Sequence, residues 1–196
     1  LIRLLQAELT AQLGTDPLAC PDYPRIVNAA HLRRLEGLLE GCQVLCGGQT
    51  GGGRMAPTLV LPPSPDAPVM QEEIFGPILP LLPFDTLEEA VSFVQDRPRP
   101  LALYLFTKSR EVERAILDRI PFGGGCVNDT VVHLSTPYLP FGGVGASGMG
   151  SYHGRASFET FSHPKSILKK GAGPDLPVRY RPYAPWKEKL LRKFLP

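Results

Sequence analysis

The sequence has few cysteines and no arrangement of cysteine or histidine that would hold a metal ion. Its four cysteines show no Cys-x-x-Cys spacing, and its four histidines form neither a His-x-x-x-His pair nor a cluster with cysteine. We therefore expect no metal site and no disulfide scaffold. No secretory leader is evident, which favours free thiols in a reducing, cytoplasmic compartment.

Long apolar runs are also missing, because proline or a charged residue interrupts every apolar stretch well before 18 residues. This excludes a membrane-spanning helix. The formal net charge is only +2, and the excess of basic residues lies between positions 165 and 193. So local a concentration predicts no nucleic-acid partner, although it would suit an anionic surface.

The composition that remains is globular and rich in turns. The 196 residues are 43% hydrophobic, which is enough for a substantial core, and the 20 Gly and 22 Pro predict many loops. There is no initiator Met, and residues 1–5 begin within a helical pattern. We therefore expect the chain to be a piece of a longer protein.

Hydrophobic periodicity predicts an alternation of helices and strands. We expect helices at 1–13, 32–39 and 109–120, a helix opened by a capping box at 86–89, and strands at 43–46, 58–61, 78–84, 101–106 and 126–128. Such alternation is typical of an α/β layer architecture. An irregular stretch at 130–150 precedes a short helix near 151–161 and a Pro-rich basic tail.

Three glycine-rich motifs match ligand-binding signatures only in part. The segment 143–148 fits G-x-G-x-x-G, but no strand immediately precedes it and no acid follows about 20 residues on. The segment 48–54 resembles a P-loop with Arg54 in place of the phosphate-binding Lys, which favours a flexible surface turn. Ser147 misses the nucleophile-elbow spacing, because Met149 fills the final glycine position, and is interpreted as a turn residue.

Cys126 and His153 each allow a structural and a chemical interpretation. Cys126 follows three glycines with no basic partner visible nearby, so a small buried residue is favoured over a catalytic thiolate. His153 lies in the glycine-rich region and could approach a ligand, but a surface or hydrogen-bonded structural histidine is favoured.

Two longer segments are more specific than these motifs. They are "QEEIFGPILP" at 71–80 and "LPFGGVGASGMGSYHGRASFETFSH" at 139–163, with "LALYLF" and "GGGCVND" between them. Together they resemble the carboxy-terminal half of the aldehyde dehydrogenase superfamily. The segments "GMGSYHG", "FETFSH" and "VRYRPY" are similar to sequences of the class 3 branch, and the resemblance covers nearly the whole chain.

The resemblance implies an α/β fold, namely the C-terminal part of an aldehyde dehydrogenase catalytic domain, with a layered sheet and flanking helices. Residues 1–163 would belong to that domain, including an active-site glycine-rich loop at 139–150. Residues 164–196 would form a Pro-rich basic tail. Pro24 stands where relatives usually have Gly, which would stiffen its loop.

The resemblance also assigns two cofactor-binding residues. By position in the E-E-I-F-G-P motif, Glu73 would hydrogen-bond the nicotinamide ribose hydroxyls and Phe75 would contact the nicotinamide. A carboxylate can accept charge-assisted hydrogen bonds from two hydroxyls, and an aromatic face offers a flat apolar surface. The alternative for Glu73, a solvated loop acid, is disfavoured by the motif, and Glu72 has no assigned role.

Four further residues are implied to support the active site. Phe141 would line the substrate tunnel, Gly142 and Gly143 would let the backbone approach the site closely, and Asn128 would help to order the catalytic loop.

In intact relatives a thiolate attacks the aldehyde, an Asn amide and a backbone N–H hold the oxyanion, and hydride passes to NAD(P)+. A Glu then activates the water that hydrolyses the thioester. The nucleophilic Cys, the general-base Glu and the dinucleotide-binding domain precede the region that this chain resembles. The chain would therefore contain no catalytic residue of its own and be inactive alone, with NAD or NADP as the cofactor of the whole enzyme.

The resemblance implies oxidation of medium- or long-chain aliphatic or aromatic aldehydes to carboxylic acids, and a homodimer. The alternative is a non-catalytic truncated product that acts as a dimerising or membrane-associated binding module. In the tail, Trp186–Leu195 places apolar residues at helical spacing with basic residues largely opposite. This predicts either peripheral contact with a membrane surface or packing against the chain itself or a partner subunit.

Overall fold

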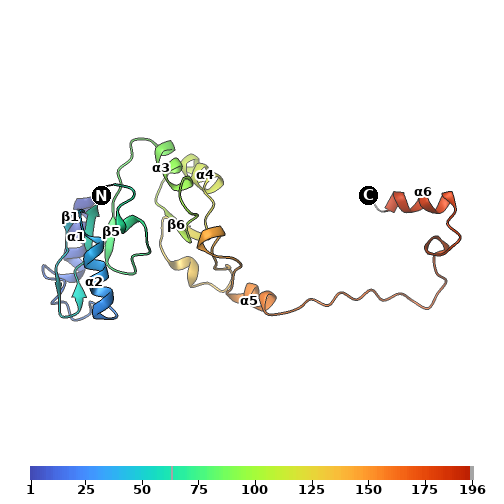
Figure 1. Cartoon of the computed structure of the whole chain (residues 1–196), viewed down its shortest axis with the longest axis horizontal. Helices are drawn as coiled ribbons and strands as arrows, with labels where there is room; N and C mark the ends of the chain where they lie inside the picture. Colours follow the sequence, from blue (N-terminus) through green and yellow to red (C-terminus); the bar gives the residue numbers. More distant parts are fainter. Residues whose placement is uncertain (63, 195–196) are drawn as a thin grey trace. The chain divides into compact units, whose positions relative to one another are not determined.

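The computed structural model describes residues 1–62 and 64–194, which divide into two compact units. The first unit consists of residues 1–97 and 114–120, and the second of residues 98–113 and 121 onward. Helices and strands are interspersed along the chain, as the labels of Figure 1 show, which confirms the predicted α/β class.

Three helices of the first unit lie close to their predicted positions, although the second begins three residues before the predicted residue 32. They are α1 (Ile2–Leu13), α2 (Ala29–Leu38) and α3 (Leu87–Gln95). Gly14 ends α1 with a positive φ of 79°, and Asn28 caps α2 by accepting from the His31 N–H at 2.8 Å. The Thr86 hydroxyl accepts from the Glu89 N–H at 3.2 Å, which confirms one half of the predicted capping box at α3. The Glu89 carboxylate accepts from the Asp85 N–H at 3.0 Å instead of from Thr86.

The sheet of the first unit has the strand order β1-β4-β5. Strand β1 (Gln43–Cys46) pairs antiparallel with β4 (Thr58–Leu61), and β4 pairs parallel with β5 (Ile78–Pro80). The strand predicted at 78–84 is too long, because β5 ends at Pro80. The last bond of this pairing runs from the Leu81 N–H to the Val60 carbonyl at 2.8 Å, and Pro83 has no N–H to extend it.

The core of this unit lies between α2 and the sheet. Leu35, Leu38, Met55, Val60, Ala67, Val69 and Ile78 form one buried cluster, which draws on α2, β3 (Arg54–Met55), β4, the 3-10 turn η1 (Pro68–Met70) and β5. Burying a side chain of the size of Leu contributes about 1.5–3 kcal/mol. The α2 face that carries Leu35 and Leu38 is therefore fixed against the strands.

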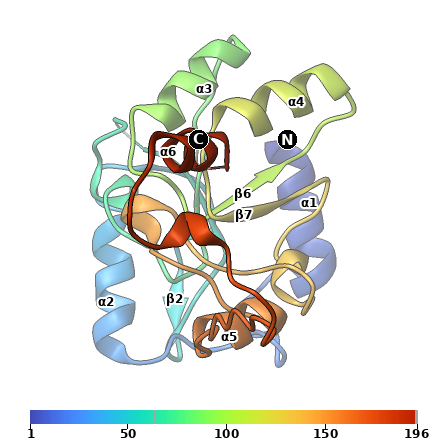
Figure 2. The same cartoon turned by 90° about the vertical axis from the view of Figure 1, so that its right-hand side faces the viewer.

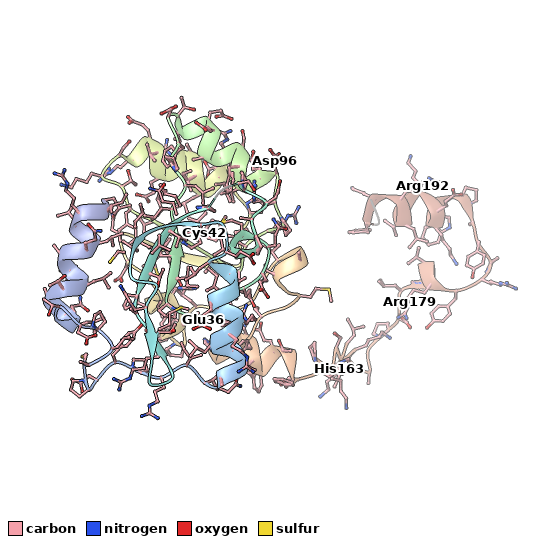
Figure 3. All side chains as sticks on the ribbon, turned by 60° about the vertical axis from the view of Figure 1, so that its left-hand side comes forward. Glu36, Cys42, Asp96, His163, Arg179 and Arg192 are labelled. Carbon is pink, nitrogen blue, oxygen red and sulfur yellow. The ribbon has the colours of Figure 1, made fainter. Side chains whose placement is uncertain are left out.

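The glycine-rich segment 48–54 forms a hairpin, which refines the predicted surface turn. Strand β2 (Thr50–Gly51) pairs antiparallel with β3, and the connecting Gly52 and Gly53 have φ of 58° and 77°. Two positive φ values in succession are typical of a type I′ turn. Glu36 of α2, labelled in Figure 3, accepts from the Thr50 hydroxyl at 2.7 Å and ties the hairpin to the helix.

The second unit contains the parallel pair β6 (Ala102–Leu105) and β7 (Gly124–Val127), shown adjacent in Figure 2. The last predicted strand, 126–128, is shifted: it begins at Gly124, and Asn128 lies outside it with φ 58°. The unit continues through the 3-10 turns η2 (Val132–Leu134) and η3 (Gly145–Ser147) to α5 (Gly154–Thr160). Helix α4 (Arg110–Arg119) contributes residues to both units.

The tail contains the turn η4 (Pro177–Arg179) and α6 (Pro185–Phe194), which confirms a helix at the predicted amphipathic segment as far as Phe194. Leu195 lies outside the described residues. An apolar pocket of about 560 Å³ lies between the two elements, lined by Leu176, Pro177, Val178, Arg179, Trp186, Leu190, Leu191 and Phe194. Figure 3 labels Arg179 on η4 and Arg192 on α6.

Lys187 interrupts the apolar arc of α6 for a structural reason. Its side chain is buried, at 7% exposure, and its ammonium donates to the Tyr180 carbonyl at 2.7 Å. Across the described residues, no helix is long and apolar enough to cross a membrane.

Candidate functional site

The loop between η1 and β5 presents Glu73 and Phe75 outward. Ile74, between them, is partly buried against the core cluster, whereas Glu73 is exposed and Phe75 is 75% exposed. Phe75 has φ 46°, a left-handed conformation that a bulky residue rarely adopts. Such strain costs about 1–3 kcal/mol and persists only where the surroundings impose it.

The surroundings that impose this conformation are on α2. His31 Nε2 lies 2.7 Å from the Phe75 carbonyl oxygen. The Arg34 guanidinium donates to the carbonyl oxygens of Glu73, at 3.4 Å, and of Ile74, and one of its nitrogens pairs with the Glu72 carboxylate at 3.1 Å. Glu72, which had no assigned role, is therefore the counter-ion of Arg34.

Glu73 and Phe75 fit a nicotinamide ribose chemically. The contacts of Glu73 with α2 use its backbone carbonyl, and within residues 1–62 and 64–194 the acid that pairs with Arg34 is Glu72. The Glu73 carboxylate is thus exposed and able to accept from hydroxyl groups, next to an exposed aromatic ring.

In the second unit, Phe141 belongs to a cluster of rings. Its backbone bridges Tyr152, with N–H to carbonyl distances of 2.8 and 2.9 Å. The Phe141 ring centroid lies 5.7 Å from that of Tyr152, 5.8 Å from that of His153 and 6.1 Å from that of His133. His153 therefore packs on Phe141 through its ring.

The two glycines after Phe141 lie where no side chain fits. A Cβ on Gly142 would be 2.1 Å from the Gly150 carbonyl oxygen, and one on Gly143 would be 2.1 Å from that of Ser147. The Ser147 hydroxyl itself is engaged with the Val144 backbone, accepting from its N–H at 2.9 Å. The segment therefore folds back on itself, with Ser147 as a turn residue.

Asn128 joins the ends of β6 and β7. Its carboxamide oxygen accepts from the Thr107 N–H at 2.9 Å, and its amide nitrogen donates to the Thr107 carbonyl at 2.9 Å. Both polar ends of the side chain are thus used on one residue, which fixes Asn128 just beyond β7.

Cys126 has a basic neighbour that the sequence did not reveal. His133, in η2, places Nδ1 3.6 Å from the Cys126 sulfur, so the expectation that no basic partner is nearby is wrong. His133 is 7% exposed, and among the described residues its Nε2 has no hydrogen-bond partner. Because the two residues lie seven positions apart on a strand and the turn after it, only the three-dimensional turn brings them together.

The other cysteine with a distinctive environment is Cys42, where burial raises the pKa of the thiol above its ordinary value. This thiol therefore stays protonated and suits a packing role beside the core cluster. Over the described part of the chain, no three His, Cys, Asp or Glu side chains gather as a metal site would require.

Comparison with known proteins identifies the class that this fold and these loops define. The sequence matches the model of the Aldehyde dehydrogenase family over residues 22–167. The chain is 44% identical to the mouse protein "Aldehyde dehydrogenase family 3 member B2" over 195 residues, which cover 97% of this chain and 41% of that protein.

Solved structures agree with this match. The structure "Substrate bound state of Staphylococcus Aureus AldH" is 43% identical with a TM-score of 0.92, covering 100% of this chain and 43% of that one. An NAD-dependent aldehyde dehydrogenase from Sinorhizobium meliloti is 28% identical with a TM-score of 0.74, covering 89% of this chain and 37% of that one.

The chain belongs to the aldehyde dehydrogenase family. Its relatives include class 3 members, which confirms the resemblance seen in the sequence. It spans about two fifths of the length of these relatives.

Sequence reasoning did not identify His31 and Arg34 as part of the candidate site. They lie about 40 residues before the loop they contact. Their spacing of three on an exposed helix face indicates only that they are neighbours there. The motif contains one signal that could have found Arg34, the unassigned Glu72, which needs a counter-ion.

Proposed function

We propose that this chain supplies the cofactor-binding loop and part of the substrate-tunnel wall of an NAD(P)-dependent aldehyde dehydrogenase. Residues 1–163 would belong to its catalytic domain and residues 164–196 to a C-terminal tail. The substrates would be medium- or long-chain aliphatic or aromatic aldehydes, and the products carboxylic acids. The observation that carries the proposal is the outward presentation of Glu73 and Phe75 on a braced loop.

The roles of the individual residues follow from their chemistry. Glu73 accepts hydrogen bonds from the ribose hydroxyls, which orients the nicotinamide against the exposed ring of Phe75. The bound cofactor would accept hydride from the substrate. The NAD dependence of the Sinorhizobium meliloti relative supports this cofactor class.

The second unit would contribute the tunnel wall. The ring of Phe141 offers apolar surface to an aldehyde chain, and its position is fixed by the bridge to Tyr152. Gly142 and Gly143 keep the following backbone compact, and Asn128 holds the end of β7 in place. The chemical step itself would use a nucleophilic Cys and a general-base Glu from a segment other than these 196 residues.

Exposed apolar side chains support an assembly larger than this chain. Met149 and Phe161 are 96% and 87% exposed, which is unusual for large apolar residues on a free surface. We propose that the rest of the catalytic domain and a second subunit of a homodimer cover such residues.

The second candidate function is a non-catalytic module that associates with membranes or a partner through its tail. Trp186, Leu190, Leu191 and Phe194 are each 40% or more exposed on one helix. Basic residues in its last turn would face anionic lipid headgroups. A peripheral cytoplasmic location suits this candidate.

A hybrid enzyme separates the two candidates. Residues 1–196 replace the matched 43% of the Staphylococcus aureus AldH chain, which supplies the remaining parts. Aldehyde-dependent NAD(P)H formation by the hybrid, compared with the parent enzyme, is expected if this chain provides a working cofactor loop and tunnel wall. A folded hybrid that binds neither cofactor nor aldehyde would leave the non-catalytic module as the better account.

A further inference from the structure

One face of α2 contacts the whole Glu72–Gly76 loop. His31, Arg34 and Leu35 occupy positions i, i+3 and i+4, which place them side by side on the helix. Arg34 and His31 bond the three successive carbonyls of residues 73, 74 and 75, and Leu35 lies beneath Gly76. In an extended strand successive residues alternate between faces, so three adjacent carbonyls reach one helix only because the chain turns at Phe75.

The hydrogen atoms of this arrangement can be assigned. Arg34 Nε lies 3.2 Å from His31 Nδ1, and a guanidinium has only donors, so Nδ1 is the acceptor. A neutral His31 then carries its hydrogen on Nε2 and donates it to the Phe75 carbonyl at 2.7 Å. Glu72, paired with Arg34 at 3.1 Å, offsets the charge that the guanidinium brings to these carbonyls.

We propose that His31 and Arg34 are positioning residues for the nicotinamide cofactor, holding the backbone of residues 73–75 so that the Glu73 carboxylate and the Phe75 ring face the ligand. This inference rests on the proposed function of the loop. Their polar atoms are engaged with backbone carbonyls, so the role does not require either side chain to contact the cofactor. They act by keeping Phe75 in its strained conformation before the cofactor arrives, which removes an ordering cost from binding.

Hydrogen exchange of the full-length gene product, without cofactor, tests whether the hydrogen bonds of His31 and Arg34 hold the loop in place. We call these hydrogen bonds the brace. Arg34→Met removes the donors and keeps the apolar stem. The readout is the Ile78 amide, which donates to the Gly76 carbonyl at 2.9 Å, and we expect it to exchange at least about tenfold faster, as for loss of a charge-assisted hydrogen bond. Arg33→Met is the matched control, since Arg33 is exposed and lies directly before Arg34 on the same helix. The amides of β4 report whether each variant remains folded.

Cofactor KM of the hybrid enzyme tests the consequence. Arg34→Met and His31→Leu should raise the KM for NAD(P)+ about tenfold with a much smaller change in kcat. His31→Gln, which retains a donor for the Phe75 carbonyl, and Arg33→Met should stay near the parent value. Arg34→Lys should be intermediate, because a lysine reaches one carbonyl but lacks the planar fork.

Three outcomes overturn parts of this account in distinguishable ways. Unchanged exchange of the Ile78 amide in Arg34→Met, with β4 protected, would show that the contacts of α2 are not needed to hold the loop. Faster exchange with an unchanged cofactor KM would keep the brace but refute the cofactor role of the loop, and with it the proposed function of Glu73 and Phe75. If Arg34→Met unfolds, His31→Leu removes only the bonds to the Phe75 carbonyl and from Arg34 Nε, keeps the Arg34 contacts with the carbonyls, and the same readouts decide.

Discussion

Leu35 lies directly against Gly76: a Cβ placed on Gly76 would be 2.5 Å from both methyl carbons of Leu35. Leu35 is fully buried in the core cluster and has no space to move away. The glycine of the E-E-I-F-G-P motif is therefore the point where the loop passes over α2. A side chain at this position would lift the loop and the residues it presents.

Gly76→Ala should destabilise the protein by about 1–3 kcal/mol, the range for overpacking a well-packed core. Denaturant unfolding measures this change. Gly37→Ala is the matched control, because Gly37 is on α2 with open space around it, and it should stabilise by about 0.5–1 kcal/mol as glycine leaves a helix. Equal effects of the two substitutions would refute the close contact.

Asn128→Ala should destabilise the protein by about 1–3 kcal/mol, because both hydrogen bonds to Thr107 are lost. Asn128→Gly loses the same bonds but relieves the positive φ, so it should be less destabilising than Asn128→Ala. Thermal unfolding of the two variants checks the order. The reverse order would contradict the left-handed backbone of Asn128, and parent-like stability of both variants would show that the amide contacts contribute little.

The contact between Asp175 and Tyr180 should be lost at both ends of the pH range. The Tyr180 hydroxyl, then the Leu176 N–H, hold the pKa of Asp175 below its ordinary value, and the same bond raises the pKa of Tyr180. A carboxyl whose pKa is lowered in the folded state stabilises the fold at pH values above its unfolded pKa. This stabilisation is lost as the pH falls through the folded pKa. A tyrosine whose pKa is raised in the folded state stabilises the fold at pH values below its unfolded pKa. This stabilisation is lost as the pH rises through the folded pKa.

Tyrosine ring resonances followed by NMR against pH measure both limits. In the parent protein the Tyr180 ring resonances should shift at acid pH as Asp175 is protonated. They should shift again at alkaline pH, at a higher pH than for an ordinary tyrosine. Asp175→Asn should abolish the acid inflection and return the alkaline one toward ordinary tyrosine. An acid inflection that persists in Asp175→Asn would contradict the assignment.

The local parts of this fold are the parts that sequence predicts. Gly14 marks the end of α1 through its own backbone preference, and the cap of α3 needs only residues 86–89. These signals act within one turn, so periodicity and capping rules are sufficient. The end of β5 was overestimated, because an apolar run indicates burial but not whether prolines can pair.

The contacts that shape the candidate site are long-range, and the sequence does not contain them in any local pattern. Arg34 reaches the loop about 40 residues later, and Cys126 meets His133 only because η2 turns back toward β7. The motifs identify Glu73 and Phe75 as candidates through family resemblance. The physical reason that both can face outward, the bonds from α2 to their carbonyls, is visible only in three dimensions.

The central claim is that the Glu73 carboxylate binds the nicotinamide ribose, and the cofactor KM of the hybrid enzyme with Glu73→Gln tests it most directly. Loss of charge-assisted bonds to two hydroxyls should raise the KM for NAD(P)+ about 10- to 100-fold. Asp66→Asn, an equally conservative change at an exposed acid of the same segment, should leave it unchanged. A Glu73→Gln enzyme with the cofactor KM of the parent would contradict the account.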